Sequence, residues 1–276
     1  METLISRSKP PNSEGMIQKI TPESAGWEFV GFEVFKIKSG QFLKQETAER
    51  EVCLVLVTGK ARVRTELESW ENLGERESVF TSSANLKGNR PYAVYVPSKD
   101  HFFVEALTDL ELAICSAPGK GTFPARLIRP DDMSYEERGE GSNTRHICNI
   151  LPETAEADSL LVVEVITPNG NWSSYPPHKH DSDNLPEESF LEETYYHRIN
   201  PSQGFAFQRV YTDDGVIDET MTVKNHDVVM VPRGYHPVGA PHGYDLYYLN
   251  VMAGPKRVWR FHDDKDHEWI KRKGNN

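Results

Sequence analysis

The sequence is poor in cysteine and lacks any apolar run long enough to cross a membrane. The longest apolar runs, residues 52–57 and 160–165, have only the length of a strand. The N-terminal segment also lacks the apolar core of a secretory signal. The three cysteines, Cys53, Cys115 and Cys148, form no closely spaced pair, and the first two lie in apolar runs. We therefore expect a cytoplasmic protein without membrane contact, with buried free thiols.

A surplus of basic residues is also missing. The 276 residues include 42 acidic and 31 basic side chains, which gives a formal net charge of -11. Binding to a nucleic-acid backbone needs a basic footprint, so we expect no nucleic-acid partner. A small anionic substrate is not excluded, because a few local Arg or Lys side chains suffice to hold it. The length allows one large domain or two of ordinary size.

Strand-length segments dominate the chain, with no long amphipathic helix between them. Residues 30–38 alternate roughly between apolar and polar side chains, as a half-buried strand does. Residues 51–57 and 61–65 flank a Thr-Gly-Lys turn and predict a hairpin. Further strand-like segments are 92–96, 102–106, 111–115, 160–166, 193–199, 205–211, 221–231, 246–252 and 257–261. This pattern predicts an all-β protein of the antiparallel sandwich or barrel type.

Two stretches of the sequence share the pattern Val-Pro-x-x-x-His. They end at His101 and at His236, and each lies between two strand-like segments. Upstream of each stretch a glutamate opens a strand, Glu51 in the first half and Glu193 in the second. The agreement predicts two copies of one β module in tandem.

The repeat predicts how the chain is divided. We expect residues 1–25 to form a poorly ordered or loosely docked arm, residues 26–135 to form the first module, and residues 136–276 to form the second. Residues 117–146, rich in Gly, Pro and charge, link the two. The Gly139-Glu-Gly141 segment precedes no phosphate-binding fingerprint, so it indicates turns without a nucleotide.

The candidate site is built around His178-Lys179-His180 in the second module. In an extended strand, side chains i and i+2 point to the same face, so both imidazoles can reach one metal ion. Lys179 then points outward. A third imidazole, His236, follows a Pro-x-Gly turn, and a glutamate completes a His₃Glu set suited to Zn, Mn or Fe. The first module has no such histidine pair, so we expect one divalent metal ion per chain.

Four neighbouring glutamates compete for the role of the carboxylate ligand. Glu193 is preferred because it begins an alternating run that also turns Tyr195 and His197 inward. If Glu192 faced inward instead, the intervening side chains of the run would line the pocket. The four candidates are Glu187, Glu188, Glu192 and Glu193.

These motifs resemble the two signature motifs of the cupin superfamily. The gap between His180 and Glu193 is wider than usual for cupins, so residues 181–191 must loop out. More narrowly, four stretches look like the 5-deoxy-glucuronate isomerase family of myo-inositol catabolism, which is related to the 4-deoxy-threo-hexosulose-uronate ketol-isomerases. They are SSYPPHKHD, LEETYYHRI, RGEGSNTRHICNIL and VPRGYHPVGAPHGYDLYYLNVMAG. The resemblance extends over about residues 25–270.

The resemblance implies a bicupin, two jelly-roll barrels in tandem, with the metal in the second barrel. It also implies an isomerase that interconverts 5-deoxy-D-glucuronate and 5-dehydro-2-deoxy-D-gluconate. Such an aldose–ketose isomerase needs a base, and the candidates are Tyr195, His197 and Glu192. The carboxylate of the sugar acid needs a cation, and the candidates are Arg145, Arg198, Arg209 and Arg233. Since bicupins often cover exposed strand edges with a partner, we expect a homo-oligomer.

Other classes of function stay open at the level of the residues. A ketol-isomerase for 4-deoxy-threo-hexosulose-uronate is the nearest alternative. Metal cupins also include dioxygenases, which use iron with an open coordination face and consume oxygen. A metal-free sugar-binding or storage protein is the non-enzymatic alternative, and it predicts a pure protein without bound metal.

Overall fold

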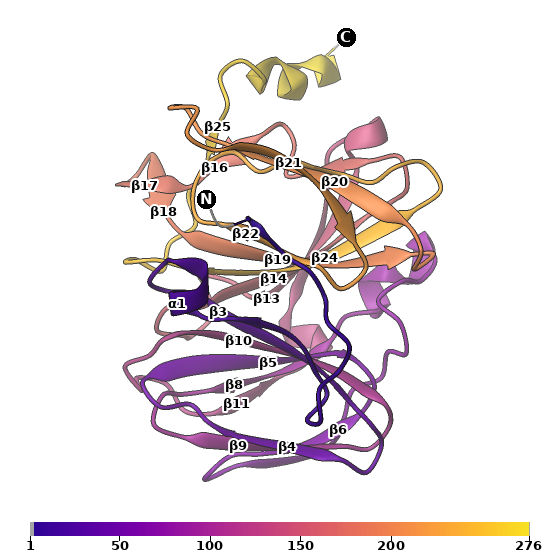
Figure 1. Cartoon of the computed structure of the whole chain (residues 1–276), viewed down its shortest axis with the longest axis vertical. Helices are drawn as coiled ribbons and strands as arrows, with labels where there is room; N and C mark the ends of the chain where they lie inside the picture. The colour runs from indigo at the N-terminus through magenta and orange to yellow at the C-terminus, as the bar shows by residue number, and fades with distance from the viewer. Residues whose placement is uncertain (1–2, 276) are drawn as a thin grey trace.

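The computed structural model describes residues 3–275, with side chains for all of these except 83, 84 and 272–275. Two halves are stacked on each other, and their largest sheets face each other across the middle of the molecule (Figure 1). Neighbouring strands are antiparallel. This arrangement confirms the predicted all-β bicupin, with two antiparallel barrels in tandem. The short helices are α1 (Pro22–Ala25), η1 (Ser83–Gly88), η2 (Pro130–Asp132), η3 (Gly141–Asn143) and η4 (Glu268–Asn275).

The first half contains a six-stranded and a four-stranded sheet. The strand orders are β11-β8-β5-β10-β3-β2 and β4-β9-β6-β7. The strands are β2 (Met16–Ile20), β3 (Gly31–Ile37), β4 (Phe42–Glu46), β5 (Arg50–Thr58), β6 (Ala61–Arg64), β7 (Ser69–Leu73), β8 (Tyr92–Val96), β9 (His101–Ala106), β10 (Leu110–Pro118) and β11 (Arg126–Ile128).

The second half contains a seven-stranded and a four-stranded sheet, together with two short strand pairs. The strand orders are β1-β22-β19-β24-β14-β13-β12 and β15-β23-β20-β21, and the pairs are β16-β25 and β17-β18. The strands are β1 (Ile5–Ser6), β12 (Ser134–Arg138), β13 (Arg145–Leu151), β14 (Leu161–Thr167), β15 (Trp172–Ser173), β16 (His178–Lys179), β17 (Asp181–Asn184), β18 (Glu188–Phe190), β19 (Glu192–Asn200), β20 (Phe205–Tyr211), β21 (Asp218–Lys224), β22 (Val228–Val231), β23 (Val238–Gly239), β24 (Asp245–Ala253) and β25 (His262–Asp263).

The central strand β5 is apolar almost throughout because both of its faces are covered. Leu54 and Leu56 pack inside the first barrel. Cys53 and Val55 point the other way and pack against the second half, in the same core as Leu249. Because neither face of β5 is exposed to solvent, its side chains need not alternate between apolar and polar, which explains the continuous apolar sequence.

The N-terminal arm belongs to both large sheets. Strand β1 pairs with β22 of the second half, and β2 pairs with β3 of the first half. The side chains of Ile5, Ile17 and Ile20 are buried. The expectation of a poorly ordered or loosely docked arm is therefore wrong for these strands, which extend one sheet in each half and cover strand edges that would otherwise be open.

The two large sheets repeat the same strand order. The series β11-β8-β5-β10-β3-β2 matches β1-β22-β19-β24-β14-β13. Val52 pairs with the last residue of β8, and Glu193 pairs with the last residue of β22. Val52 is therefore the counterpart of Glu193, and Glu51 is the counterpart of Glu192. The sequence comparison that equated Glu51 with Glu193 was wrong by one residue, which in a strand changes the face of the sheet.

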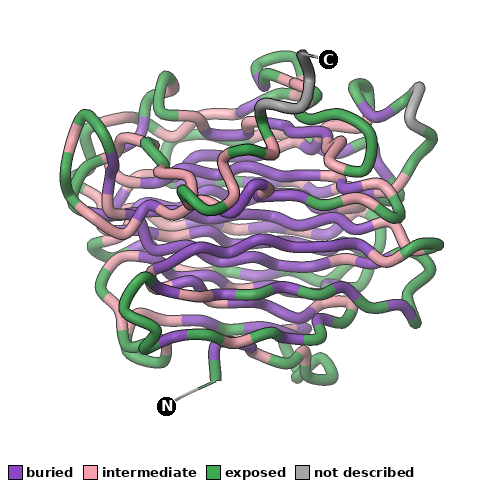
Figure 2. Tube along the Cα trace, turned by 90° about the horizontal axis from the view of Figure 1, so that it is seen from above, coloured by how far each residue is buried: buried purple, intermediate pink, exposed green. Residues whose placement is uncertain are grey.

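Burial follows the strands. In the view from above, buried segments run across the middle of the molecule and exposed segments gather at the turns on either side (Figure 2). All three cysteines are buried free thiols, as expected for Cys53 and Cys115. Among the described residues, no helix has the length and apolar character needed to cross a membrane.

Candidate metal centre

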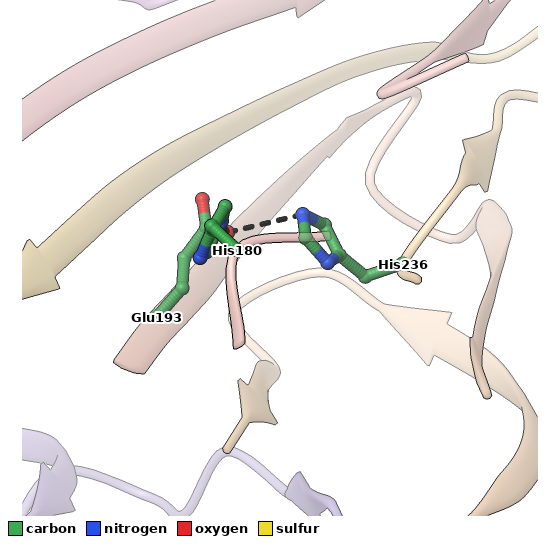
Figure 3. Close-up of side chains that lie close together, drawn as sticks. All are labelled: His180, Glu193 and His236. Carbon is green, nitrogen blue, oxygen red and sulfur yellow. Dashed lines mark hydrogen bonds and ion pairs between the residues drawn. The ribbon is translucent and has the colours of Figure 1, made fainter. Parts of the chain in front are cut away.

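Two histidines and one glutamate converge inside the second barrel (Figure 3). The Nε2 atom of His180 lies 3.1 Å from Oε2 of Glu193, and Nε2 of His236 lies 3.2 Å from the same oxygen. One ligand atom from each residue lies within 4.8 Å of the other two. All three side chains are buried, at most 3% exposed. They come from the start of β19 and from the segments that follow β16 and β22.

The hydrogen bonds of the two imidazoles turn their lone pairs toward the glutamate. Nδ1 of His180 donates to the carbonyl oxygen of Leu191 at 2.9 Å, and Nδ1 of His236 donates to that of Gly234 at 2.8 Å. A carbonyl oxygen only accepts, so in the neutral ring Nε2 carries a lone pair. Two nitrogen lone pairs and a carboxylate then face one another in a buried space, an arrangement that a cation stabilises.

An unpartnered buried atom supports this fit to a metal ion. Nε2 of His236 has no hydrogen-bond partner among the residues that the structure describes, because its contact with Glu193 lacks hydrogen-bond geometry. Burial lowers the pKa of His236 to about 4, which keeps the ring neutral. Burial also disfavours the charged form of His180, but the hydrogen bond and the charge of Glu193 outweigh it and raise the pKa of His180.

The fourth predicted ligand, His178, lies at the edge of this group. Its ring centre is 4.9 Å from that of His236 and 6.4 Å from that of His180. Burial lowers the pKa of His178 well below its ordinary value, and the two neighbouring imidazoles add to the effect. His178 is therefore a neutral ring that lines the same cavity as Glu193.

Among its described side chains, the first barrel has no equivalent buried group. His101, the counterpart of His236, stands with Glu66 and Asp100 in an exposed cluster at the surface. Its side chain is 42% exposed. The buried Val52 occupies the place of Glu193.

A cavity of about 270 Å³ opens beside Glu193 and His178. Its wall includes two tyrosines whose hydroxyls are held by consecutive serines, in pairs that the sequence did not reveal. The hydroxyl of Tyr195 lies 2.9 Å from Oγ of Ser174, and that of Tyr248 lies 2.5 Å from Oγ of Ser173. Burial raises the pKa of both tyrosines, so both phenols keep their protons at neutral pH. Alternation along β24 was the signal that could have placed Tyr248 inside the barrel.

The three candidate bases occupy different places. Tyr195 lines the cavity. His197 is buried in the same barrel, where its Nε2 lies 2.9 Å from Oε1 of Gln208, but it does not line this cavity. Burial lowers the pKa of His197 to about 4, so the ring is neutral.

Glu192 points away from the cavity, into the contact between the two halves. Its carboxylate accepts hydrogen bonds from the backbone N–H groups of Glu28, Phe29 and Val30 at 2.7, 2.7 and 2.9 Å. The assignment of Glu192 as a candidate base is therefore wrong. Because β19 alternates, Glu192 and Glu193 must face opposite sides.

The remaining candidate ligands, Glu187 and Glu188, lie in the predicted insertion. Residues 181–191 form the hairpin β17-β18, which projects from the side of the second half (Figure 1). The Glu188 carboxylate accepts a hydrogen bond from the backbone N–H of Asp181 at 2.7 Å. Glu187 is exposed, so neither belongs to the buried group.

Only one of the four candidate arginines lines the cavity. Arg145 contributes to its wall and has no ion pair with a carboxylate in the part of the chain that the structure describes. The other three are paired elsewhere, so their assignment to the substrate is wrong. These pairs are Arg198 with Glu111 at 2.6 Å, Arg209 with Asp218 at 2.8 Å, and Arg233 with Asp214 at 2.8 Å.

Comparison with known proteins assigns the chain to a family. The sequence matches the KduI/IolB family over residues 4–270. The chain belongs to the KduI/IolB family. A relative from Geobacillus kaustophilus (strain HTA426), named 5-deoxy-glucuronate isomerase, is 62% identical over 270 residues, which are 98% of this chain and 96% of the relative. One of the same name from Bacillus subtilis (strain 168) is 51% identical over 260 residues, 94% of each chain.

Solved structures agree with the fold of a KduI/IolB protein. An IolB-like protein from Salmonella typhimurium LT2 has a TM-score of 0.92 at 51% identity, covering 98% of this chain and 99% of the other. The oxalate decarboxylase of Lactobacillus farciminis has a TM-score of 0.66 at 12% identity, covering 95% and 89%. The second likeness concerns the fold alone. In this KduI/IolB chain, the buried donors described above fit a divalent metal ion.

Proposed function

We propose that this KduI/IolB protein is an aldose–ketose isomerase that interconverts 5-deoxy-D-glucuronate and 5-dehydro-2-deoxy-D-gluconate in myo-inositol catabolism. The observation that carries the proposal is the buried donor set of His180, Glu193 and His236 beside a cavity with an unpaired Arg145. The names of the relatives from Geobacillus and Bacillus supply the substrate. The chain covers 96% and 94% of the length of these two relatives.

One divalent ion, Zn, Mn or Fe, is held by His178, His180, Glu193 and His236 in this proposal. When bound, such an ion supplies Lewis-acid polarisation of the substrate carbonyl. The residues fix what surrounds it. The backbone carbonyls that accept from Nδ1 of His180 and His236 set the tautomers, and burial keeps water from competing for the donors.

Tyr195 is the proposed proton carrier of the reaction. Its hydroxyl lies in the cavity wall and is held at 2.9 Å by Oγ of Ser174. Because burial raises its pKa, Tyr195 is protonated in the resting site and can donate a proton to a sugar oxygen. The hydrogen moves between C1 and C2 either by proton transfer through an enediol or as a hydride. Isomerisation in D₂O distinguishes these routes, because product without deuterium contradicts the enediol.

The first barrel acts as a scaffold in this proposal. The division between residues 26–135 and 136–276 is kept, except that β12 (Ser134–Arg138) belongs to the second half, so the boundary lies just before residue 134. In the part of the first barrel that the structure describes there is no full ligand set, since Val52 stands in the place of the glutamate and the His101 side chain is 42% exposed. It also supports the second barrel, because the backbone N–H groups of residues 28–30 donate hydrogen bonds to Glu192, the neighbour of Glu193.

The decisive experiment compares His180→Ala with His101→Ala. Metal content is measured by elemental analysis, and isomerisation of 5-deoxy-D-glucuronate is followed by NMR. We expect His180→Ala to lose both metal and activity while His101→Ala keeps both, because only His180 belongs to the buried donor set. Full activity of His180→Ala would contradict the site.

Parallel assays test the alternative reactions. 4-Deoxy-threo-hexosulose-uronate is offered to the same preparation, and faster turnover of it would replace the proposed substrate. Oxygen uptake with either sugar acid would indicate a dioxygenase. Wild-type protein without bound metal or turnover would favour a sugar-binding protein.

A further inference from the structure

The C-terminal segment 259–271 forms part of the wall of the cavity beside the proposed metal site. Strand β25 pairs with β16, the strand that carries His178. The backbone N–H of Asp264 donates to the carbonyl of Pro177 at 2.9 Å. The carboxylate of Asp264 also accepts a hydrogen bond from the hydroxyl of Tyr211 at 2.6 Å. The segment is thus fastened to the barrel next to the site.

Four residues of this segment line the cavity, namely Trp259, Phe261, Asp263 and Lys271. The ring of Phe261 lies 4.7 Å from the ring of His178. Lys271 and Asp263 both line the cavity and form an ion pair with each other. Nζ of Lys271 also lies 5.6 Å from the centre of the Phe261 ring. The ion pair and the ring hold the ammonium group at the cavity wall.

A second cavity, of about 700 Å³, continues from the first toward the surface. The two cavities share four lining residues, Arg145, Tyr175, Pro176 and Lys271. The outer cavity is also lined by the loop of residues 139–143. Arg145 and Lys271 therefore stand where the outer cavity meets the inner one.

These two residues are the cations that line both cavities, so both lie where an anion at this junction would bind. Arg145 has no ion pair within the described part of the chain. Lys271 is half exposed and has Asp263 as its ion-pair partner. Arg138, the third cation of the inner wall, does not line the outer cavity, and it donates to both carboxylate oxygens of Glu136 at 3.0 and 2.7 Å. In a chain of net charge -11, two adjacent cations at a cavity junction attract a small anion.

We propose that Lys271 determines specificity for the acid group of the substrate. Together with Arg145 it binds the carboxylate of the sugar acid at the junction of the two cavities, and this leaves the carbonyl end of the sugar to the inner cavity. The guanidinium offers a planar pair of donors, and the ammonium adds a point charge. This inference rests on the proposed function for the identity of the sugar acid.

The test uses the metal-loaded protein and two probes, D-glucuronate and D-glucose, which differ by the carboxylate. Calorimetric titration is made with wild type, Lys271→Met, Lys271→Arg and Lys265→Met. Lys265 is the matched control, because it belongs to the same segment but lines a different cavity. We expect Lys271→Met to weaken binding of D-glucuronate about tenfold, the size of a lost charge-assisted contact, without changing that of D-glucose. Lys271→Arg should restore affinity, since it restores the charge.

Turnover separates this inference from the proposed function. With 5-deoxy-D-glucuronate, Lys271→Met should raise KM about tenfold and leave kcat unchanged, since uniform binding is lost. Equal effects of Lys271→Met and Lys265→Met, or a wild type that does not prefer D-glucuronate, would overturn the inference. A wild type that prefers D-glucuronate but does not isomerise 5-deoxy-D-glucuronate would overturn the function and leave the carboxylate site standing.

Discussion

Replacing Glu192 tests whether this buried carboxylate is a structural clamp or part of the chemistry. It accepts three consecutive backbone N–H groups from the first half, and its neighbour Glu193 belongs to the proposed metal site. A glutamate of the first half makes the corresponding contact with the second half. The counterpart Glu51 accepts hydrogen bonds from the N–H groups of residues 158–160 in the second half, at 2.6 to 2.7 Å. The two halves thus hold each other through a matched pair of carboxylates.

The expected loss of folding stability depends on how many backbone N–H groups lose their acceptor when Glu192 is replaced. One oxygen of Glu192 takes the N–H of Glu28, and the other takes those of Phe29 and Val30. A glutamine can keep only one of these oxygens, so at least one N–H loses its acceptor, at a cost of about 2 kcal/mol. Burial raises the pKa of Glu192, so loss of the charge itself costs little. Alanine frees all three donors, including that of the fully buried Val30, and we expect about 4 kcal/mol.

The assay is urea unfolding at neutral pH, with metal content and kcat measured on the folded fraction. Glu51→Gln should cost at least as much as Glu192→Gln, because Glu51 accepts the three corresponding N–H groups and also the hydroxyl of Tyr95 at 2.6 Å. The exposed Glu187→Gln, which makes the same change of charge, should leave stability unchanged. A Glu192→Gln protein of wild-type stability that has lost kcat would refute the clamp and return Glu192 to the chemistry.

Three further predictions concern the site and the contact between the halves. Glu193→Gln should lower metal content at least tenfold, by elemental analysis, because a neutral amide replaces the only carboxylate of the buried donor set; unchanged metal content would contradict its role as ligand. Tyr195→Phe should lower kcat about a hundredfold with little change in KM, in steady-state kinetics, and an unchanged kcat would exclude it as the proton carrier. Burial, with Arg198 and Lys36 close by, lowers the pKa of His226 from 6.5 to about 4, so its contribution to folding stability is full above pH 6.5 and falls by about 1–3 kcal/mol as the pH approaches 4. In urea unfolding, His226→Gln should therefore lose less stability than wild type between pH 6.5 and 4, while the buried His197 and His236 keep the rest of the slope, and an unchanged slope would contradict this role of His226.

Much of the fold could be predicted because the deciding patterns are local. Alternation and turn residues mark the strands, and the spacing of His178 and His180 places both on one face of an extended segment. The same alternation turned Glu193 toward the barrel interior, where the structure brings it together with His180 and His236. These expectations needed only the period of a strand and a turn.

The misplaced residues depend on contacts between distant parts of the chain. Glu192 binds backbone groups more than 160 positions earlier in the sequence, so no local pattern assigns it. Lys271 reaches the cavity only because β25 pairs with β16, a ladder of two residues without a sequence signal of its own. The sequence alone leaves Arg198 as a candidate for binding the substrate, but in the fold it forms an ion pair with Glu111 of the first half. Paired charges of this kind are invisible until both partners are placed.

The duplication explains why a single barrel can carry the site. In the first barrel Val52 extends an apolar interior shared with Leu54 and Phe102. A glutamate at position 52 alone would be a buried charge without a cation, because the side chain of His101 is 42% exposed and does not reach the interior of the barrel. In the second barrel each member of the proposed donor set is likewise costly to bury unless the other members and an ion are present. We therefore expect the three side chains of the donor set to occur together in a barrel or not at all. The first barrel, which has no such set among its described residues, supports the second by binding Glu192 and thereby positioning the start of β19.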